Sequence, residues 1–343
     1  MSELPLLFSD VARWYAVSTV ALGIRTGLVD ALLAGGGTAD ELANAAAVDP
    51  DNAARWADAM VTGGYATLDE GRYAPVMDAL GLIKRGSVLD VRAIVELLVP
   101  LGALLPRTVT AIRDGQGISS GEFQAVLGMT AERVNVPMFR KLLLSEWIDG
   151  HPDLRVALKH GIDVAEVGPG GGTALRILGT AFPASRFVGF DVDSATVADA
   201  NATAEAEGLD NVRFEVVDGR AMPSAAFDLV CIFDAFHHMT DPAAVLDGMR
   251  SALRPGGSML IAEAALSGDP VLDGSDPTAV IVYGSDLIYC YQESRAGGGA
   301  GLGSTWAGRG LSEMLSSHGF VETGRVESKA GYIVVRAQPG PLG

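Results

Sequence analysis

The chain has little cysteine and comparatively little positive charge, and each shortage excludes a class of protein. Two cysteines in 343 residues, Cys231 and Cys290, make no disulfide framework and lack the spacing of a metal motif. The 25 Lys and Arg residues face 42 Asp and Glu residues, which gives a net charge of −17. Without a local basic patch, such a chain repels nucleic acid and anionic membranes. We therefore expect neither as a partner.

Long hydrophobic runs are also missing. The start, MSELPLLFSD, has no basic segment before its short apolar run and is a poor signal peptide. The most apolar later run, Ile94 to Pro106, contains Glu96 and Pro100 and is too short to cross a bilayer. We therefore expect a soluble protein of the reducing cytoplasm, and its length predicts two or three domains.

The first 87 residues predict a small helical module that ends in a hairpin. Residues 1–35 have a helical pattern without one apolar stripe, so we expect burial on more than one side; the apolar positions are Val11, Tyr15, Val20, Ile24 and Val29. Thr38 and Glu41 form a capping box, and Asp49-Pro50 begins another helix. YATLDEGRYAP reads as two short strands around a turn. This is the element order of a winged helix.

Charge argues against DNA binding by this module. From Thr38 to Arg85 the chain carries eight acids and four bases, whereas a DNA-binding surface needs Lys and Arg against phosphate. We therefore expect a structural or dimerising domain over residues 1–87. Residues 88–150 predict a helical linker bundle that contributes to a substrate pocket; in it VPMFRKLLLSEWI is amphipathic, with Phe139, Leu142, Leu143 and Trp147 facing inward.

From Asp163 onwards strands and helices alternate, which indicates a parallel sheet wound on both faces. The predicted strands are VAEVG, a strand ending at Asp191, one ending at Asp218, FDLVCIFD and GSMLIAEA, the last opened by a Pro-Gly-Gly turn. An insertion follows at about residues 266–305, then a helix over Trp306 to His318 and two closing strands around Lys329-Ala330-Gly331. We expect residues 151–343 to form this domain.

The stretch VAEVGPGGGTALRIL organises that domain as a strand, a tight turn and a helix. Gly168, Gly170 and Gly172 permit the positive dihedral angles of the turn and a close approach of a ligand to the backbone. The free amides at the helix start favour a phosphate or a carboxylate there. Glu166 stands two residues before the first of these glycines.

Other polar residues follow the neighbouring strands. In an open parallel sheet the ligand lies outside the carboxyl ends of the strands. Asp191 ends the second strand, where an acid can bind both ribose hydroxyls, and Asp218 ends the third. Asp234, His237 and His238 follow the fourth strand. We therefore expect all of them at one edge of the sheet.

Two classes of cofactor share this geometry. A dinucleotide needs a third glycine where this chain has Thr173, and Glu166 close to a pyrophosphate is unfavourable. That carboxylate suits a ligand with an ammonium and a sulfonium instead. S-adenosylmethionine has both, together with a carboxylate, a ribose and an adenine. A nicotinamide oxidoreductase is the rival interpretation.

Five motifs in register make the chain resemble the class I S-adenosylmethionine-dependent methyltransferases over about residues 145–337: EVGPGGG, FDVD, VVDGRAMP, FDLVCIFDAFHHMTDP and LRPGGSMLIAE. The N-terminal module and GLGSTWAGRGLSEMLSSHGF resemble the branch that methylates small molecules and dimerises through that module. The resemblance implies an α/β fold. Its doubly wound, mostly parallel, seven-stranded Rossmann-like sheet would follow an all-α, winged-helix N-terminal domain.

The resemblance also implies residue roles toward S-adenosylmethionine. Its methionine part would meet Glu166 and the three alternating glycines, and its ribose would meet Asp191. The remaining cofactor contacts would be Val192, Asp218 and Gly219 around the adenine, and Phe233 and Asp234 beneath the sulfonium.

Methyl transfer needs aligned reactants and excluded water, and it needs a base only if the acceptor must lose a proton. His237 and His238 are the candidates for that base, because histidine titrates near neutral pH; one of them can equally be a packing residue. Metal ligation is the weaker alternative, since adjacent histidines rarely bind one metal well and the sequence shows no third ligand. We therefore expect no metal.

Aromatic residues could line an acceptor pocket, although each could equally be a core residue; they are Phe139, Trp147, Phe236, Tyr283, Tyr289, Tyr291 and Trp306. They favour an aromatic acceptor, phenol-like or indole-like, and methylation at O, N or C stays open. An Ala- and Gly-rich chain fits bacterial secondary metabolism. Two alternatives remain, a winged-helix transcription regulator that senses S-adenosylmethionine and a 2-oxo-acid C-methyltransferase.

Overall fold

The computed structural model describes residues 5–83, 91–128, 130–276, 278–328 and 331–340. The chain divides into two compact units, Met1–Ala103 and Leu104–Gly343. The boundary falls inside helix α6 (Val91–Asp114), so the predicted linker bundle of residues 88–150 is divided between the two units. The predicted first domain, residues 1–87, belongs entirely to the first unit.

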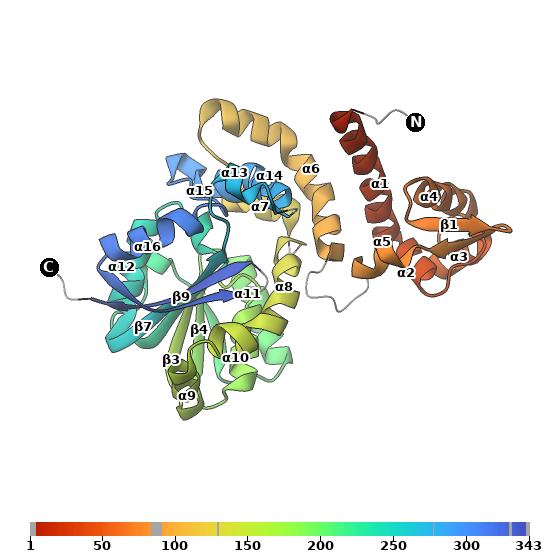
Figure 1. Ribbon diagram of the computed structural model, residues 1–343. Helices are drawn as coiled ribbons and strands as arrows, with labels where there is room; N and C mark the ends of the chain where they lie inside the picture. The colour runs from red at the N-terminus through yellow and green to blue at the C-terminus, as the bar shows by residue number, and fades with distance from the viewer. Residues whose placement is uncertain (1–4, 84–90, 129, 277, 329–330, 341–343) are drawn as a thin grey trace. The chain divides into compact units, whose positions relative to one another are not determined.

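The first unit packs short helices and a hairpin around its own core (Figure 1). Its elements before α6 are α1 (Leu6–Thr26), α2 (Leu28–Leu33), α3 (Ala39–Ala46), α4 (Pro50–Thr62), β1 (Ala66–Asp69), β2 (Arg72–Pro75), α5 (Met77–Leu80) and the 3₁₀ turn η1 (Gly81–Ile83). The predicted capping box of Thr38 and Glu41 is present, and Asp49 caps α4. The predicted helices and hairpin are therefore confirmed in this unit.

Helix α1 is buried along its second half only. Val20 and Ile24 lie in the core of the first unit, with exposed fractions of 2% and 4%. Val11 and Tyr15 are 47% and 65% exposed. The prediction that this segment is buried on more than one side was therefore wrong for its first half, because the described residues of the unit leave those turns exposed.

Helix α6 is longer than the apolar run in the sequence suggested. It has 24 residues and is long and apolar enough to cross a membrane by length and composition, and about 28% of its most apolar window is buried. The sequence estimate of a run too short for a bilayer was therefore wrong on length. A partly buried helix of a water-soluble protein passes the same test, so this helix is weak evidence for a membrane span.

The second unit is built on one seven-stranded sheet with the order β5-β4-β3-β6-β7-β9-β8. Its strands are β3 (Asp163–Val167), β4 (Arg186–Asp191), β5 (Val212–Val216), β6 (Phe227–Phe233), β7 (Leu253–Ala264), β8 (Phe320–Ser328) and β9 (Tyr332–Pro339). β9 runs antiparallel between β7 and β8, and the neighbouring pairs from β5 to β7 are parallel. The predicted mostly parallel sheet with an inserted antiparallel strand is confirmed.

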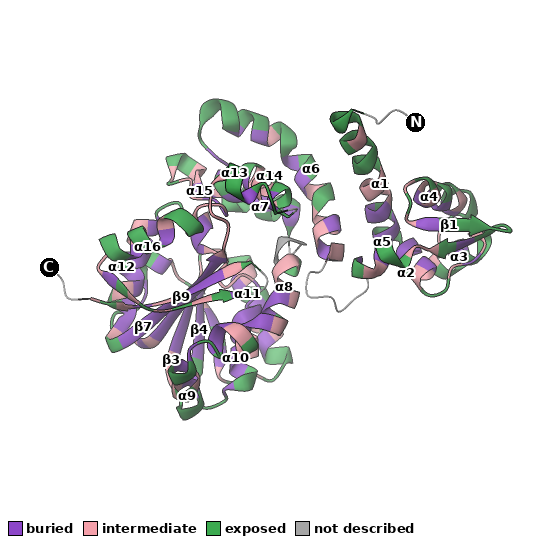
Figure 2. Ribbon diagram, in the orientation of Figure 1, coloured by how far each residue is buried: buried purple, intermediate pink, exposed green. Residues whose placement is uncertain are grey.

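Helices cover both faces of this sheet. One apolar core joins the sheet to α9 (Pro152–His160), α10 (Thr173–Ala181) and α11 (Ser194–Ala206), and a second joins it to α12 (Pro242–Ala252) and α16 (Ala307–Ser317). Figure 2 shows the strands of the sheet mostly buried between helices whose outer faces are exposed. This doubly wound arrangement leaves the carboxyl ends of the parallel strands free for a ligand.

Further short helices complete the second unit. They are α7 (Ser120–Leu127), α8 (Thr130–Leu142) and its π-helical continuation η2 (Leu143–Ile148), and, within the predicted insertion, α13 (Pro270–Asp273), α14 (Ala279–Ser285), the π-helix η5 (Asp286–Cys290), α15 (Tyr291–Ser294) and the 3₁₀ turn η6 (Ala296–Gly298). The four residues predicted to face inward from α8 and η2 are all buried. That amphipathic pattern was a correct prediction.

Strand limits differ from the sequence estimate in two places. β5 ends at Val216, two residues before Asp218, because Asp218 already caps the 3₁₀ turn η3 (Gly219–Ala221). β7 begins at Leu253, so the Pro-Gly-Gly sequence lies inside the strand instead of preceding it. In the predicted final turn, Lys329 and Ala330 lie outside the described residues.

Candidate functional site

The glycine loop after β3 has the conformation that its sequence predicted. Gly168, Gly170 and Gly172 have φ angles of 64°, 53° and 73°, all in the left-handed region that favours glycine. Gly172 is the N-cap of α10, and a Cβ atom there would lie 2.1 Å from the ring of Phe214. Glycine at this position therefore allows the start of α10 to pack against the buried ring of Phe214.

Glu166 supplies negative charge beneath this loop. It lies in β3 between Gly189 of β4 and Cys231 of β6, and 1% of it is exposed. A carboxylate in such surroundings favours a cationic neighbour over an anionic one. An ammonium or sulfonium group therefore suits this position better than a pyrophosphate.

Asp191 ends β4 beside the same loop. Its carboxylate accepts a hydrogen bond from the backbone N–H of Asp193 at 3.0 Å and another from Gly170. Burial raises the pKa of this carboxyl, and these backbone amides act in the opposite direction. The acid is thus fixed next to the loop, as a ribose ligand requires, while the next residue, Val192, is 64% exposed.

Asp218 is engaged within the chain. Arg220 donates to it from Nη2 at 2.6 Å and from its backbone N–H at 2.9 Å, and this guanidinium lowers the pKa of the carboxyl. An adenine amine would share the carboxylate with Arg220. Gly219 is buried, and a Cβ atom on it would lie 2.7 Å from Val167.

Phe233 and Asp234 end β6 in different surroundings. Phe233 is 3% exposed and its ring centroid lies 5.6 Å from that of Trp147. Asp234 has a φ of 53°, a strained conformation for a residue other than glycine, and Asn135 donates to its carboxylate at 2.6 Å. Burial raises the pKa of Asp234. The left-handed backbone conformation at Asp234 lets the chain turn from β6 toward η4 (Phe236–His238).

Glu263 of β7 holds His237. The Nδ1 atom of His237 lies 2.5 Å from Oε2 of Glu263, and the other oxygen of this carboxylate accepts the backbone N–H groups of Phe236 and His237. Both side chains are buried. Burial lowers the pKa of His237, but the Glu263 carboxylate outweighs it and raises the pKa to about 9. The ring is therefore fixed in orientation through one nitrogen.

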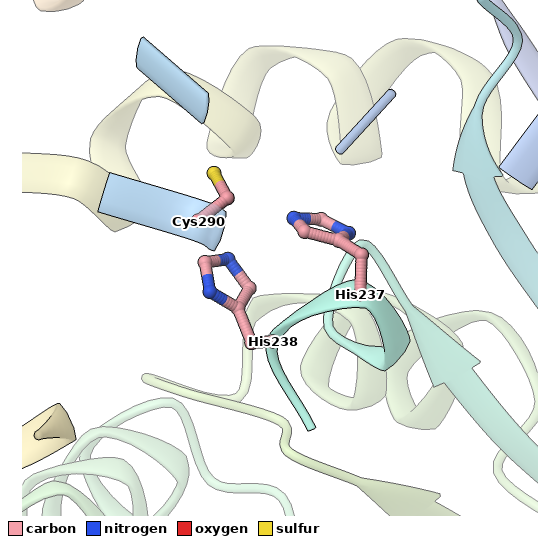
Figure 3. A group of neighbouring side chains, drawn as sticks. All are labelled: His237, His238 and Cys290. Atoms are coloured by element: carbon pink, nitrogen blue, oxygen red, sulfur yellow. The ribbon is translucent and has the colours of Figure 1, made fainter. Parts of the chain in front are cut away.

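His238 lies against a carboxylate of the insertion, without the hydrogen bond that holds His237. Its Nδ1 atom lies 2.7 Å from Oε2 of Glu293. Its ring centroid is 4.2 Å from that of His237 and 5.0 Å from that of Tyr289. In Figure 3, Cys290 lies across from the two rings. The predicted histidine pair is thus one side of a cluster that the insertion completes.

Sequence reasoning missed the partners of this cluster. Glu263 had a visible signal, because it is an acid within an otherwise apolar strand, yet it received no role. Cys290 and Glu293 had none, since nothing in the local pattern of the insertion relates them to a pair more than 50 residues earlier. Asn135 belongs to α8 and reaches Asp234 only through the tertiary fold.

The predicted pocket aromatics separate into two groups. Phe139, Trp147 and Phe236 are buried with exposed fractions of 8%, 0% and 0%. The other four belong to the insertion or follow it directly. The ring of Tyr289 lies beside that of His238, and the ring of Trp306 packs against that of Phe236. Tyr283 donates a hydrogen bond to the Asp273 carboxylate, and Tyr291 is 38% exposed. Tyr289 is therefore the aromatic residue that adjoins the histidine pair.

A cavity of about 360 Å³ lies elsewhere in the second unit. It is lined by Gly150, His151, Pro152, Asp153, Thr323, Gly324, Arg325, Arg336 and Gln338. None of these is a predicted site residue. The chemistry of the strand edge, and not the size of this cavity, therefore locates the candidate site.

Comparison with solved structures shows which fold this is. The chain matches the O-methyltransferase NcsB1 from neocarzinostatin biosynthesis, solved with S-adenosylmethionine and 2-hydroxy-5-methyl naphthoic acid, with a TM-score of 0.68 and 19% identity over 99% of this chain and 100% of that one. It matches human N-acetylserotonin methyltransferase in complex with S-adenosylmethionine with a TM-score of 0.67 and 16% identity, covering 99% and 100%.

A putative O-methyltransferase from Nostoc punctiforme PCC 73102 has a TM-score of 0.73 and 16% identity, covering 98% of this chain and 99% of that one. At these identities the likeness establishes the fold over the length of each chain. Independently, residues 158–276 match the family described as a methyltransferase domain. That segment contains the glycine loop, Asp191 and the histidine pair. The second unit therefore contains a segment that matches methyltransferase domains in sequence, within the fold of these solved structures.

Proposed function

We propose that this chain transfers a methyl group from S-adenosylmethionine to a small aromatic molecule. The observation that carries the proposal is the loop site, defined as Glu166, the three positive-φ glycines and Asp191, inside a matched methyltransferase domain. A buried carboxylate below the loop suits the ammonium and sulfonium, and Asp191 suits the ribose. The same arrangement disfavours a dinucleotide.

The acceptor class rests on the surroundings of the histidine pair. His237 and His238 lie next to Tyr289, which offers an aromatic face to a flat acceptor. NcsB1 was solved with naphthoic acids. We infer a phenol-like or indole-like acceptor held beside the two histidines, at least one of which contributes to turnover. Bacterial secondary metabolism would be the setting.

Two measurements test the activity. Calorimetry should show tight binding of S-adenosylhomocysteine and no binding of NADH; the reverse pattern would remove the proposal. The protein is then incubated with labelled S-adenosylmethionine and a panel of phenols, indoles and 2-oxo acids. We expect the labelled methyl group to appear on a phenol or an indole. Transfer to a 2-oxo acid alone would replace the aromatic acceptor by a C-methylation substrate. Transfer to nothing, together with specific binding of genomic DNA fragments, would favour a regulator.

We further propose that the first unit is a winged-helix dimerisation module of a cytoplasmic homodimer. The first half of α1 exposes a run of large apolar side chains within its unit: Leu6, Leu7, Phe8, Val11, Trp14 and Tyr15. Such a patch favours a protein partner, and a second copy of the chain is the one we infer. Light scattering should give twice the chain mass, and Trp14→Glu should shift it toward the monomer. A monomeric wild-type protein would contradict the proposal.

A further inference from the structure

The histidine–cysteine cluster, His237, His238 and Cys290, brings three metal-binding side chains to one place. The two histidines come from η4, and Cys290 ends the π-helix η5 in the insertion. Candidate ligand atoms of the three residues lie within 4.8 Å of one another. Figure 3 shows one nitrogen of each ring directed toward the space between the three side chains. π-Helical turns are rare and often occur at functional sites.

A carboxylate lies against the Nδ1 atom of each histidine. Glu263 is hydrogen-bonded to His237 at 2.5 Å, whereas Glu293 lies 2.7 Å from Nδ1 of His238 at an ion-pair distance without hydrogen-bond alignment. Nε2 is therefore the nitrogen that each ring presents to the cluster. Histidines that bind metals almost always have their other nitrogen on a carboxylate, a carbonyl or water, which fixes the ring and raises its basicity. Here His237 has that hydrogen-bonded partner, and the Glu293 carboxylate lies within ion-pair distance of His238.

The buried charge around the cluster also favours a cation. Four carboxylates surround or adjoin two imidazoles: Asp234, Glu263, Asp286 and Glu293. The side chains of Glu263 and Glu293 are 0% and 12% exposed, and Asp286 is 9% exposed. Metal binding requires both imidazoles to be neutral, so in the bound state these carboxylates would keep their negative charge and a divalent cation would offset part of it.

We propose that Nε2 of His237, Nε2 of His238 and Sγ of Cys290 bind one divalent transition metal ion of the zinc type. Two imidazoles and a thiolate are the donors that such ions prefer, and three protein ligands leave a fourth position open. Binding forms one metal–sulfur and two metal–nitrogen bonds, and it releases to solvent the Cys290 thiol proton and the proton that each imidazolium carries on Nε2. Glu263 keeps its bonds to His237 and to two backbone amides, so it orients a ligand and is not one itself.

The chemical role of this ion rests on the proposed function. An acceptor with a phenol or carbonyl oxygen would take the open position beside Tyr289. Coordination to a metal lowers the pKa of a bound oxygen, so the acceptor could lose its proton without a free histidine base. Binding of the ion itself does not depend on this role, and it can be measured without an acceptor.

The test uses the full-length protein treated with a chelator and then titrated with Co²⁺, which reports its ligands by absorption. We expect one Co²⁺ per chain and a thiolate-to-cobalt charge-transfer band. Cys290→Ser should abolish that band, whereas Cys231→Ala, a change at the other buried cysteine, should retain it. Thermal melting and S-adenosylhomocysteine binding verify that each variant is folded.

A second variant tests the orienting carboxylate in case Cys290→Ser fails to fold. Glu293→Gln should weaken Co²⁺ binding about 10- to 100-fold, because the glutamine amide cannot raise the basicity of His238 as a carboxylate does. Glu313→Gln, at an exposed position on α16, should leave the affinity unchanged. The proposal is overturned if the wild-type protein binds no Co²⁺, if Cys290→Ser keeps the charge-transfer band, or if Glu293→Gln binds Co²⁺ as the wild type does. Intact S-adenosylhomocysteine binding in those cases would leave the methyltransferase proposal standing.

Discussion

The loop site and the histidine–cysteine cluster lie in one domain but are built in opposite ways. Most of the loop site comes from one continuous stretch, Glu166 to Gly172, and its shape depends on the backbone dihedral angles of three glycines. The cluster joins side chains from η4 and the insertion, and its two histidines lie against carboxylates that are distant in sequence, Glu263 of β7 and Glu293 of the insertion. A site made of backbone is determined locally, whereas a site made of side chains is determined by packing.

Gly172→Ala should damage the loop site most. A Cβ atom there would lie 2.1 Å from Phe214, and the φ of 73° is strained for alanine. We expect a loss of about 3 kcal/mol in the free energy of unfolding by urea, together with weaker S-adenosylhomocysteine binding. Gly121→Ala is the matched control, because a Cβ atom at Gly121 meets nothing within 4 Å. Equal stability of the two variants would contradict a locally fixed loop.

Glu263→Gln should damage the cluster and leave the loop site intact. The amide is nearly isosteric but cannot hold Nδ1 of His237 and two backbone amides as the buried carboxylate does. Turnover with labelled cofactor should fall about 10- to 100-fold, the range for loss of an orienting carboxylate. Calorimetry should show unchanged S-adenosylhomocysteine affinity. If cofactor affinity falls as far as turnover, the two sites are not separable.

Asp191→Asn should give the converse result. The carboxylate is the expected acceptor for the ribose hydroxyls, and a charged hydrogen bond contributes about 1.5–3 kcal/mol. We therefore expect S-adenosylhomocysteine affinity to fall by roughly ten- to a hundredfold, measured by calorimetry, with Co²⁺ binding at the cluster unchanged. Asp199→Asn, on the exposed face of α11, is the control. Retained affinity in Asp191→Asn would remove this residue from the cofactor site.

Asp163 lies at the opposite end of β3 from the loop and should affect neither site. Arg186 and Arg254 hold its pKa below the ordinary value. Because its pKa is lower in the folded state, the ionised Asp163 carboxylate stabilises the folded protein at pH values above its unfolded-state pKa of 3.8. This contribution to the free energy of unfolding is lost as the pH falls through the folded-state pKa. Asp163→Asn should lower stability at neutral pH by about 1 kcal/mol or less and flatten the acid limb of a stability–pH curve. An unchanged acid limb would assign the acid sensitivity to other carboxyls.

The sequence predicted the sheet of the second unit well because its signals are local. Alternating apolar strands, the glycine turn and the helix caps each act within a few residues, and β3, β4 and α16 lie where the pattern placed them. The exposed first half of α1 was not predictable, since an apolar pattern does not tell which of its faces the unit covers. The role of Glu263 could not be predicted either, because only the fold shows that its carboxylate contacts the imidazole ring of His237.

The amino-acid sequence by itself determined the glycine loop, the acid that ends β4 and the position of the histidine pair at the edge of the sheet. These depend on backbone dihedral angles, strand length and the rule that parallel strands end together. Only the tertiary structure decided that Glu263, Glu293 and Cys290 meet those histidines. Such contacts depend on how an insertion packs over the sheet, and no short-range periodicity encodes that packing.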